Sequence, residues 1–173
     1  MFDLLLKNGD VYDGSGRVVC GQDIAIQDGI IVDIGKNLTG IAQQTIDASG
    51  LIVSPGFIDM HTHSDFTLIA DGRAESQVHQ GVTTEVIGQC GISCAPVVSK
   101  DSIKHVSPWF TSKAKYKGWL SFSEYLDALD ETTLGVNVMA FVGHGTIHRA
   151  VMGDTLEPGN PDDIKKMSRL TDQ

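Results

Sequence analysis

The chain of 173 residues carries a net charge of −9, and this acidic balance argues against binding to nucleic acid or to anionic membrane surfaces. Hydrophobic residues make up 41% of the chain, a composition that is typical of a globular protein and excludes a disordered or fibrous one. No apolar run reaches the length of a membrane span, and the N-terminus lacks the features of a signal peptide. We therefore expect a cytoplasmic protein without nucleic-acid or membrane partners.

Residues 1–55 contain short alternating apolar stretches that are separated by glycine turns. The first strand, Asp3–Lys7, is followed by Asn8-Gly9, which predicts a hairpin turn. Further strands are predicted over residues 20–27, 30–34 and 45–47. The pattern predicts a small β-sandwich or meander as a first domain over residues 1–55. Cys20 within it is expected to be a small, buried or half-buried apolar residue.

The second predicted domain, residues 56–173, alternates strands with helices. Strands are predicted over residues 57–61, 82–88 and 136–142, and helices over 74–80, 119–129 and a stretch from Pro161 onward. Residues 99–118 are expected to form a solvated loop. Polar residues that could form a binding or catalytic site follow the C-terminal end of each strand, which is the pattern of a parallel α/β fold.

The length of this second domain limits the architecture. An eight-stranded barrel takes roughly 250 residues, so residues 56–173 suffice for about three of its βα units. Three parallel strands cannot close a barrel, and as an open sheet they leave unpaired edges and uncovered apolar faces. The chain is therefore either the front part of a longer protein or dependent on a partner.

Two histidines, one residue apart, follow the first strand of the second domain. Residues i and i+2 of a strand point to the same face, so His61 and His63 can direct both imidazoles at one point while Thr62 faces away. Imidazole is the commonest protein ligand for zinc and similar ions. A lone His-x-His is more often a pair of surface residues, and only its surroundings favour a metal site here.

Those surroundings consist of a turn, a buried strand and two acids. Pro55-Gly56 punctuates the chain, and Phe57, Ile58 and Met60 are expected to be buried in the strand. Asp59 and Asp65 supply carboxylates that can orient the ring nitrogens of the histidines.

The stretch Pro55–Asp65, with the sequence PGFIDMHTHSD, resembles the first barrel strand of the amidohydrolase superfamily of metal-dependent hydrolases. Later segments narrow the resemblance to the D-aminoacylase (N-acyl-D-amino-acid deacylase) branch. The resemblance covers the whole chain, which matches only the N-terminal portion of such an enzyme. It implies that residues 1–55 are part of a β-sandwich and that residues 56–173 are the first three βα units of a TIM-like (β/α)8 barrel.

Cys90 lies at the end of the second predicted strand, beside the first in a parallel barrel. The three cysteines are sparse and odd in number, so by spacing alone Cys90 is most simply a small buried residue, as is Cys94. In the resembling enzymes, however, a cysteine in a G-x-C-G setting that matches Gly88–Gly91 is a metal ligand. The resemblance therefore implies a site for one or two Zn²⁺ ions that includes His61, His63 and Cys90.

The third strand end, Val142–Gly153, also resembles the D-aminoacylase branch. The resemblance implies that His144 faces the site and positions substrate without binding metal. His144 and His148 have the spacing of a metal pair on a helix, but Gly143 and Gly145 favour a loop. The family more usually has an arginine where His148 stands, so no role is transferred to that residue.

The implied activity is hydrolysis of N-acyl-D-amino acids, small-molecule substrates whose amide is attacked by metal-activated water while a carboxylate moves the proton. The family's catalytic aspartate and two further histidine ligands lie on later strands, so no catalytic residue is assigned up to Gln173 and the chain alone is expected to be inactive. One alternative is a cyclic-amide hydrolase of the dihydroorotase or hydantoinase type, which Cys90 and residues 141–153 disfavour. Another is a non-catalytic remnant or a partner-dependent subunit. The oligomeric state is left open.

Overall fold

The computed structural model describes residues 1–98 and 116–172, so most of the predicted loop over residues 99–118 falls outside the described residues. The chain divides into two compact units, Met1–Pro55 and Gly56–Gln173. Within the described residues, no helix combines the length and apolarity needed to cross a membrane.

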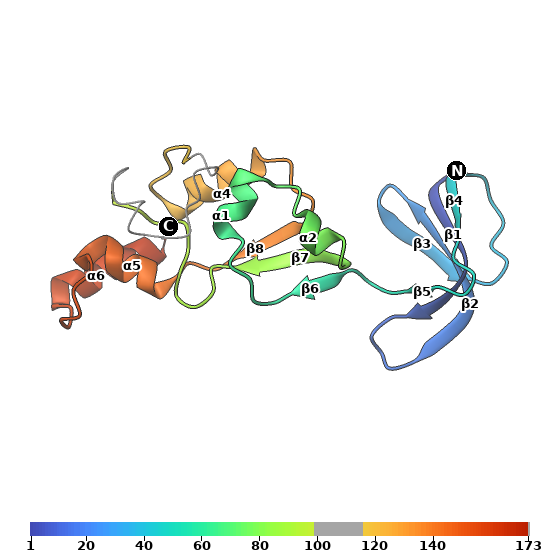
Figure 1. The fold of residues 1–173 in the computed structure, drawn as a ribbon, viewed down its shortest axis with the longest axis horizontal. Helices are drawn as coiled ribbons and strands as arrows, with labels where there is room; N and C mark the ends of the chain where they lie inside the picture. The colour runs from blue at the N-terminus through green and yellow to red at the C-terminus, as the bar shows by residue number, and fades with distance from the viewer. Residues whose placement is uncertain (99–115, 173) are drawn as a thin grey trace. The chain divides into compact units, whose positions relative to one another are not determined.

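The first unit is a five-stranded sheet in the order β3-β2-β1-β4, with β5 also paired to β1 (Figure 1). Its strands are β1 (Phe2–Tyr12), β2 (Val18–Gln27), β3 (Ile30–Gly35), β4 (Ala42–Asp47) and β5 (Ile52–Val53). Strand β2 is antiparallel to β1 and β3, whereas β4 and β5 run parallel to β1. The predicted strands of this region are confirmed.

The hairpin predicted at Asn8-Gly9 is wrong, because β1 runs straight through these residues. Between Leu6 and Gly9 the strand advances by one residue more than its partner β2, which is a β-bulge. Asn8 takes the left-handed conformation, with φ 63°. Its backbone N–H donates to Asp23 Oδ1 at 2.9 Å and its side-chain amide donates to Asp47 Oδ1 at 3.1 Å. Bonds to neighbouring strands therefore hold Asn8 in a bulge.

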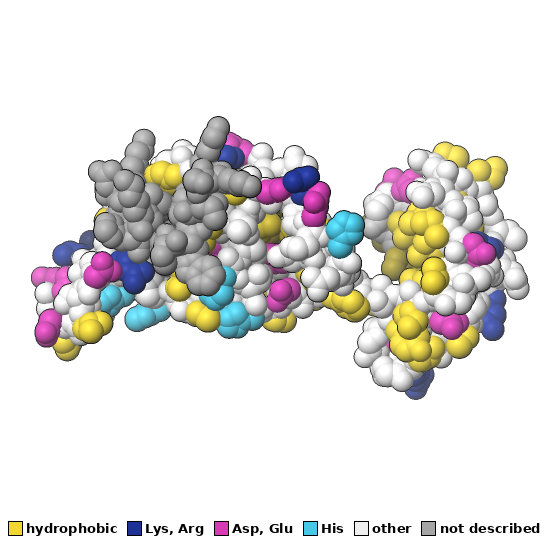
Figure 2. Space-filling view, viewed as in Figure 1, with side chains coloured by type: hydrophobic (Ala, Val, Ile, Leu, Met, Phe, Trp, Pro, Cys, Tyr) yellow, Lys and Arg dark blue, Asp and Glu magenta, His cyan; other side chains and the backbone are white. Residues whose placement is uncertain are grey.

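Some side chains of the first unit are more exposed than expected. Cys20 is exposed, because residues 18–21 at the start of β2 face solvent. The apolar side chains of β3 are also more than half exposed, at Ile30, Ile31, Val32 and Ile34. Figure 2 shows hydrophobic side chains gathered on the surface of this unit.

An ion pair ties the first unit together at its centre. Asp23 is 1% exposed, and Lys7 Nζ lies 2.7 Å from its Oδ2. Backbone N–H groups of Asn8 and Leu38 also donate to this carboxylate, each at 2.9 Å. The hydrogen bond from Lys7, followed by the one from Asn8, lowers the pKa of Asp23 below its ordinary value.

The second unit contains a three-stranded parallel sheet in the order β6-β7-β8, as the alternating pattern predicted. The strands are β6 (Phe57–Asp59), β7 (Val82–Ile87) and β8 (Asn137–Ala140). The helices are α1 (Asp65–Ala70), α2 (Glu75–Val78), α4 (Phe122–Asp130), α5 (His144–Met152) and α6 (Pro161–Thr171). Helices α2, α4 and α6 correspond to predicted helices, whereas α1 was not predicted.

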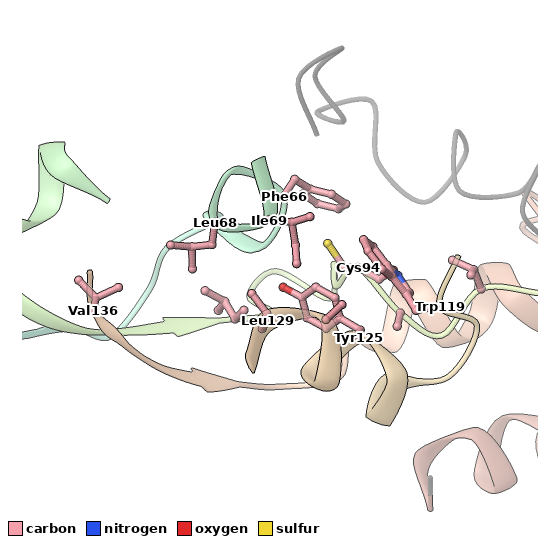
Figure 3. Packing of buried hydrophobic residues seen from close by; sticks show 12 residues of the cluster. Phe66, Leu68, Ile69, Cys94, Trp119, Tyr125, Leu129 and Val136 are labelled. Carbon is pink, nitrogen blue, oxygen red and sulfur yellow. The ribbon is translucent and has the colours of Figure 1, made fainter. Parts of the chain in front are cut away.

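The helices α1, α2 and α4 lie on one side of this sheet (Figure 1). The apolar core between α1, α4 and the sheet is shown in Figure 3, where Phe66, Leu68, Tyr125 and Leu129 pack together. The buried hydroxyl of Tyr125 is satisfied, since its Oη donates to the carbonyl of Asp65 at 2.9 Å. Ser121 caps α4 in a capping box with Glu124. Cys94 is fully buried in this core, as expected.

The opposite face of the sheet is open within the described part of the chain. Ile58 and Met60 on this side, and Phe57 at the start of β6, were expected to be buried, but they are 57%, 63% and 59% exposed. Met139 and Phe141 of the third strand region are 57% and 52% exposed. Successive residues of a strand face opposite sides, so burying Val138 and Ala140 against the helices directs Met139 to the uncovered side.

Replacement of Asp23 by asparagine should destabilise the first unit, and the loss should depend on pH. A carboxyl whose pKa is lowered by folding contributes stability above its unfolded pKa of about 3.9 and loses it as the pH falls through the folded value. Urea unfolding of the wild type and Asp23→Asn should therefore differ most near neutral pH and converge below about pH 3. A difference that stays constant with pH would contradict this role.

Candidate metal centre

His61 and His63 lie just beyond the first strand of the second unit. Strand β6 ends at Asp59, earlier than predicted, so the two histidines occupy a bend rather than a regular strand. The backbone N–H of His61 donates to Asp59 Oδ1 at 3.1 Å. The next residue, Thr62, donates its N–H to the carbonyl of Val86 at 3.3 Å. The bend is therefore fixed both to its own strand and to β7.

Cys90 is presented by a tight turn at the end of β7. Residues Gly88, Cys90 and Gly91 have φ angles of 78°, 54° and 74°, all in the left-handed region. Left-handed backbone at a non-glycine residue costs free energy and is found disproportionately at functional sites. The turn places Cys90 Sγ 3.1 Å from His61 Nε2.

The three side chains form a cluster with the dimensions of a metal site. One ligand atom each from His61, His63 and Cys90 lies within 4.8 Å of the others. The ring centroids of the two histidines are 5.7 Å apart and the rings are inclined at 72°. The donor set suits zinc, whose bond lengths of about 2.0–2.3 Å place tetrahedral ligand atoms roughly 3.5 Å apart. The 3.1 Å between His61 Nε2 and Cys90 Sγ is close to that separation. His61 and Cys90 are exposed, which leaves the cluster accessible.

The prediction of a loop at His144 is wrong, because helix α5 begins at this residue. Gly143 is the N-cap in an extended conformation, and the N–H of Ile147 donates to its carbonyl at 3.0 Å. Glycine is favoured at Gly145, although it lies in a helix, because a side chain there would approach the carbonyl oxygen of Gly91 to 2.9 Å. These glycines serve close packing of α5 against the Cys90 turn. His144 and His148 consequently lie on one face of α5, one turn apart.

Two buried carboxyl groups lie behind the histidine segment. Asp65 and Glu85 are 1% and 0% exposed. Asp65 Oδ1 accepts from the backbone N–H of Gly88 at 2.9 Å, and Glu85 Oε2 accepts from the hydroxyl of Ser64. The other oxygen of each carboxyl, Asp65 Oδ2 and Glu85 Oε1, has no hydrogen-bond partner. Burial raises the pKa of Asp65 to about 6.

Asp59 and Asp65 were expected to orient imidazole nitrogens. Asp59 Oδ1 accepts from the backbone N–H of His61 and Asp65 Oδ1 from that of Gly88. The charge of His63 also acts on Asp65 and lowers its pKa against the larger effect of burial. Glu85 was not singled out in the sequence. An acid within the apolar, β-branched run of a parallel strand is the signal that identifies it, because such strands are buried on both faces.

A model of the family described as "Amidohydrolase family" matches residues 44–172 of the chain. The chain belongs to the amidohydrolase family. The match spans most of the chain, including β6, the histidine segment, the Cys90 turn and α5.

Two enzymes of Alcaligenes xylosoxydans xylosoxydans are among the amidohydrolases similar to this chain. Its D-aminoacylase is 37% identical over 99% of the chain and 35% of its own length. Its N-acyl-D-aspartate deacylase is 36% identical over 99% of the chain and 34% of its own length. The chain thus spans about a third of the length of these relatives.

Solved structures of such amidohydrolases share the fold of the chain. A crystal structure of D-aminoacylase superposes with a TM-score of 0.86 at 34% identity, over 99% of this chain and 36% of that one. The N-acyl-D-glutamate deacylase of Bordetella bronchiseptica, solved with zinc and a phosphonate inhibitor, gives a TM-score of 0.83 at 29% identity, over 98% and 35%. An L-hydantoinase of Arthrobacter aurescens matches at 22% identity with a TM-score of 0.58, which shows a common fold alone.

Close backbone packing fixes the Cys90 turn of this amidohydrolase against the next strand. A side chain at Gly88 would lie 1.9 Å from the carbonyl oxygen of Phe141, and one at Gly143 would lie 2.5 Å from that of Gly91. Both contacts are with backbone, which cannot move away as a flexible side chain can. Glycine is therefore required at Gly88 both for its left-handed φ and for lack of space.

Gly88→Ala should destabilise the second unit by at least about 2 kcal/mol, because left-handed strain adds to a steric overlap. The matched control is Gly153→Ala, at a residue with φ 71° but no atom within 4 Å of the added carbon. That control, with ψ −149°, carries backbone strain without a steric overlap, so it should lose less free energy than Gly88→Ala. Urea unfolding measures both changes, and equal losses would show that the close approach to Phe141 is not a constraint.

Proposed function

We propose that this chain is the N-terminal portion of a metal-dependent amide hydrolase that removes the acyl group from N-acyl-D-amino acids. The observation that carries the proposal is the convergence of His61, His63 and Cys90 in a chain 37% identical to a D-aminoacylase. The N-acyl-D-aspartate and N-acyl-D-glutamate deacylases among its relatives support the same small-molecule substrate class.

The fold proposed for the complete protein follows from the uncovered surfaces. We assign β6, β7 and β8 as the first three strands of a TIM-like (β/α)8 barrel, with α1, α2 and α4 on its outside. The apolar face that carries Ile58 and Met139, each 57% exposed, would then line the barrel interior and be covered by later strands. The exposed apolar residues of β3 are proposed to pack in the same way against the rest of a β-sandwich.

The metal assigned to the cluster is zinc, as one or two ions. His61 and His63 offer neutral imidazole nitrogens and Cys90 a thiolate, a donor set that suits zinc better than calcium or magnesium. When bound, the metal would polarise the scissile carbonyl and lower the pKa of a bound water. The exposed positions of His61 and Cys90 leave room for substrate and for further ligands from the remainder of the protein.

His144 is proposed to position the substrate. It is exposed at the N-terminus of α5, and this helix begins against the Cys90 turn, where Thr146 donates its N–H to the carbonyl of Gly91 at 3.1 Å. An imidazole next to helix N–H groups is suited to hold a carbonyl or carboxylate oxygen. We assign no proton-transferring base among the described residues, and the proposal places that carboxylate on a later strand.

Cys90→Ala in the complete protein should strongly reduce bound zinc and the rate of release of free amino acid from an N-acyl-D-amino acid. Removal of one of the ligands should lower activity by at least about 100-fold, since the metal supplies several kcal/mol of transition-state stabilisation. Metal analysis and a continuous amine assay measure the two effects. Cys20→Ala, at an exposed cysteine of the first unit, is the matched control and should change neither quantity. Unchanged zinc content in Cys90→Ala would exclude the cysteine as a ligand.

His144→Gln should raise KM by about tenfold, which corresponds to the loss of about one hydrogen bond to a charged group, while zinc content stays at the wild-type level. Steady-state kinetics with metal analysis of the same samples distinguishes positioning from metal binding. His79→Gln provides the control. His79 is exposed and lies between α2 and β7, before the N-terminal end of β7, whereas the metal cluster lies beyond its C-terminal end. Loss of zinc in His144→Gln would instead identify this residue as a ligand.

A further inference from the structure

We propose that Ser64 and Glu85 are positioning residues of the metal centre, whose buried hydrogen bond fixes His61 and His63 relative to Cys90. The inference rests on the metal site proposed above and goes beyond its ligands.

Glu85 is an unusual residue for its position in β7. It lies in register between Asp59 of β6 and Val138 of β8, on the face of the sheet that packs against the helices. Its side chain is 0% exposed, and Oε1 has no hydrogen-bond partner. Burying a carboxyl group with one oxygen unsatisfied costs free energy, whereas an apolar side chain of similar volume would add to the core. Stability therefore does not explain the choice of glutamate.

Ser64, the hydrogen-bond partner of Glu85, does not use its side chain to cap helix α1. Ser64 is the N-cap of α1, where a serine hydroxyl usually accepts a hydrogen bond from the first turn of the helix. Here the side chain makes no capping bond. Its hydroxyl donates to Glu85 Oε2 and lies 3.2 Å from Thr62 Oγ1. The residue directly after His63 is thereby attached to the centre of β7.

Two further bonds attach the same segment to β7 on either side of this contact. The N–H of Thr62 donates to the carbonyl of Val86 at 3.3 Å, between the two histidines. The N–H of Gly88 donates to Asp65 Oδ1 at 2.9 Å, at the start of the turn that carries Cys90. The Ser64–Glu85 bond is the fully buried side-chain contact between the two others. Together the three bonds fix the histidine half of the cluster relative to the cysteine half.

Small displacements between these halves matter because ligand atoms must stay near tetrahedral separations around the ion. Residues that hydrogen-bond to the ligands or their segment maintain this geometry. Their removal typically lowers metal affinity by about 10- to 100-fold. Ser64 and Glu85 touch neither substrate nor metal in this arrangement, so they act only through the position of the histidines.

The test is Co²⁺ binding to the complete protein and to its Ser64→Ala and Glu85→Gln variants, measured by chelator competition and by the thiolate-to-cobalt absorption band. Ser64→Ala should weaken binding by about 10- to 100-fold. Glu85→Gln should lose less, because its amide oxygen still accepts from Ser64. Thermal unfolding without metal reports on the fold of each variant.

Tyr125→Phe is the matched control for loosening of α1. It removes the buried hydrogen bond to the carbonyl of Asp65, which neighbours Ser64, but leaves the contacts to β7 intact. Its cobalt affinity should stay within about twofold of the wild type. The inference is overturned if Ser64→Ala binds cobalt as tightly as the wild type, or if Tyr125→Phe loses as much affinity. A wild type that binds no cobalt would instead refute the metal centre, and normal binding without amide hydrolysis would refute the proposed activity alone.

Discussion

The parallel pairing of β6 with β7 is the constraint on which the candidate site depends. It places the C-terminal ends of the two strands side by side. His61 and Cys90 therefore lie close together, although they are 29 positions apart in the sequence. The pairing extends past the last strand residue through the bond from Thr62 to Val86. Without this alignment, the imidazoles and the thiol would have no common point at which to bind an ion.

Two glycines at the strand ends and two buried carboxyl groups behind the histidines hold this arrangement in place. At Gly88 and Gly143 the backbone of one strand end lies directly against the next, so that no side chain can be inserted. Behind the histidines, Asp65 and Glu85 accept bonds that link the segment to β7 while each keeps one oxygen unsatisfied. Free energy is thus lost in the carboxyl groups and in the left-handed Cys90, and the packing of α1 and α4 on the sheet must offset it.

The uncovered apolar surfaces connect the fold to the proposed function. A parallel sheet is stable when both of its faces are covered, yet the described residues cover only the face toward α1, α2 and α4. The amidohydrolases that the chain matches are about three times its length. A longer protein whose remaining strands cover Ile58 and Met139 would both bury this face and bring further ligands to the cluster.

The sequence by itself indicated the strands, three of the helices and the candidate ligands. Period-two apolar runs indicated the strands, and the motif around His61 with its resemblance indicated the chemistry. Only the tertiary structure decided what depends on contacts between distant residues. Asn8 forms a bulge because Asp23 and Asp47 bind it. Helix α5 begins at His144, against the Cys90 turn, where Gly91 accepts a hydrogen bond from Thr146. Glu85 became significant only once Ser64 was found against it. Local propensity cannot reveal such pairings, because each is set by residues far away in the chain.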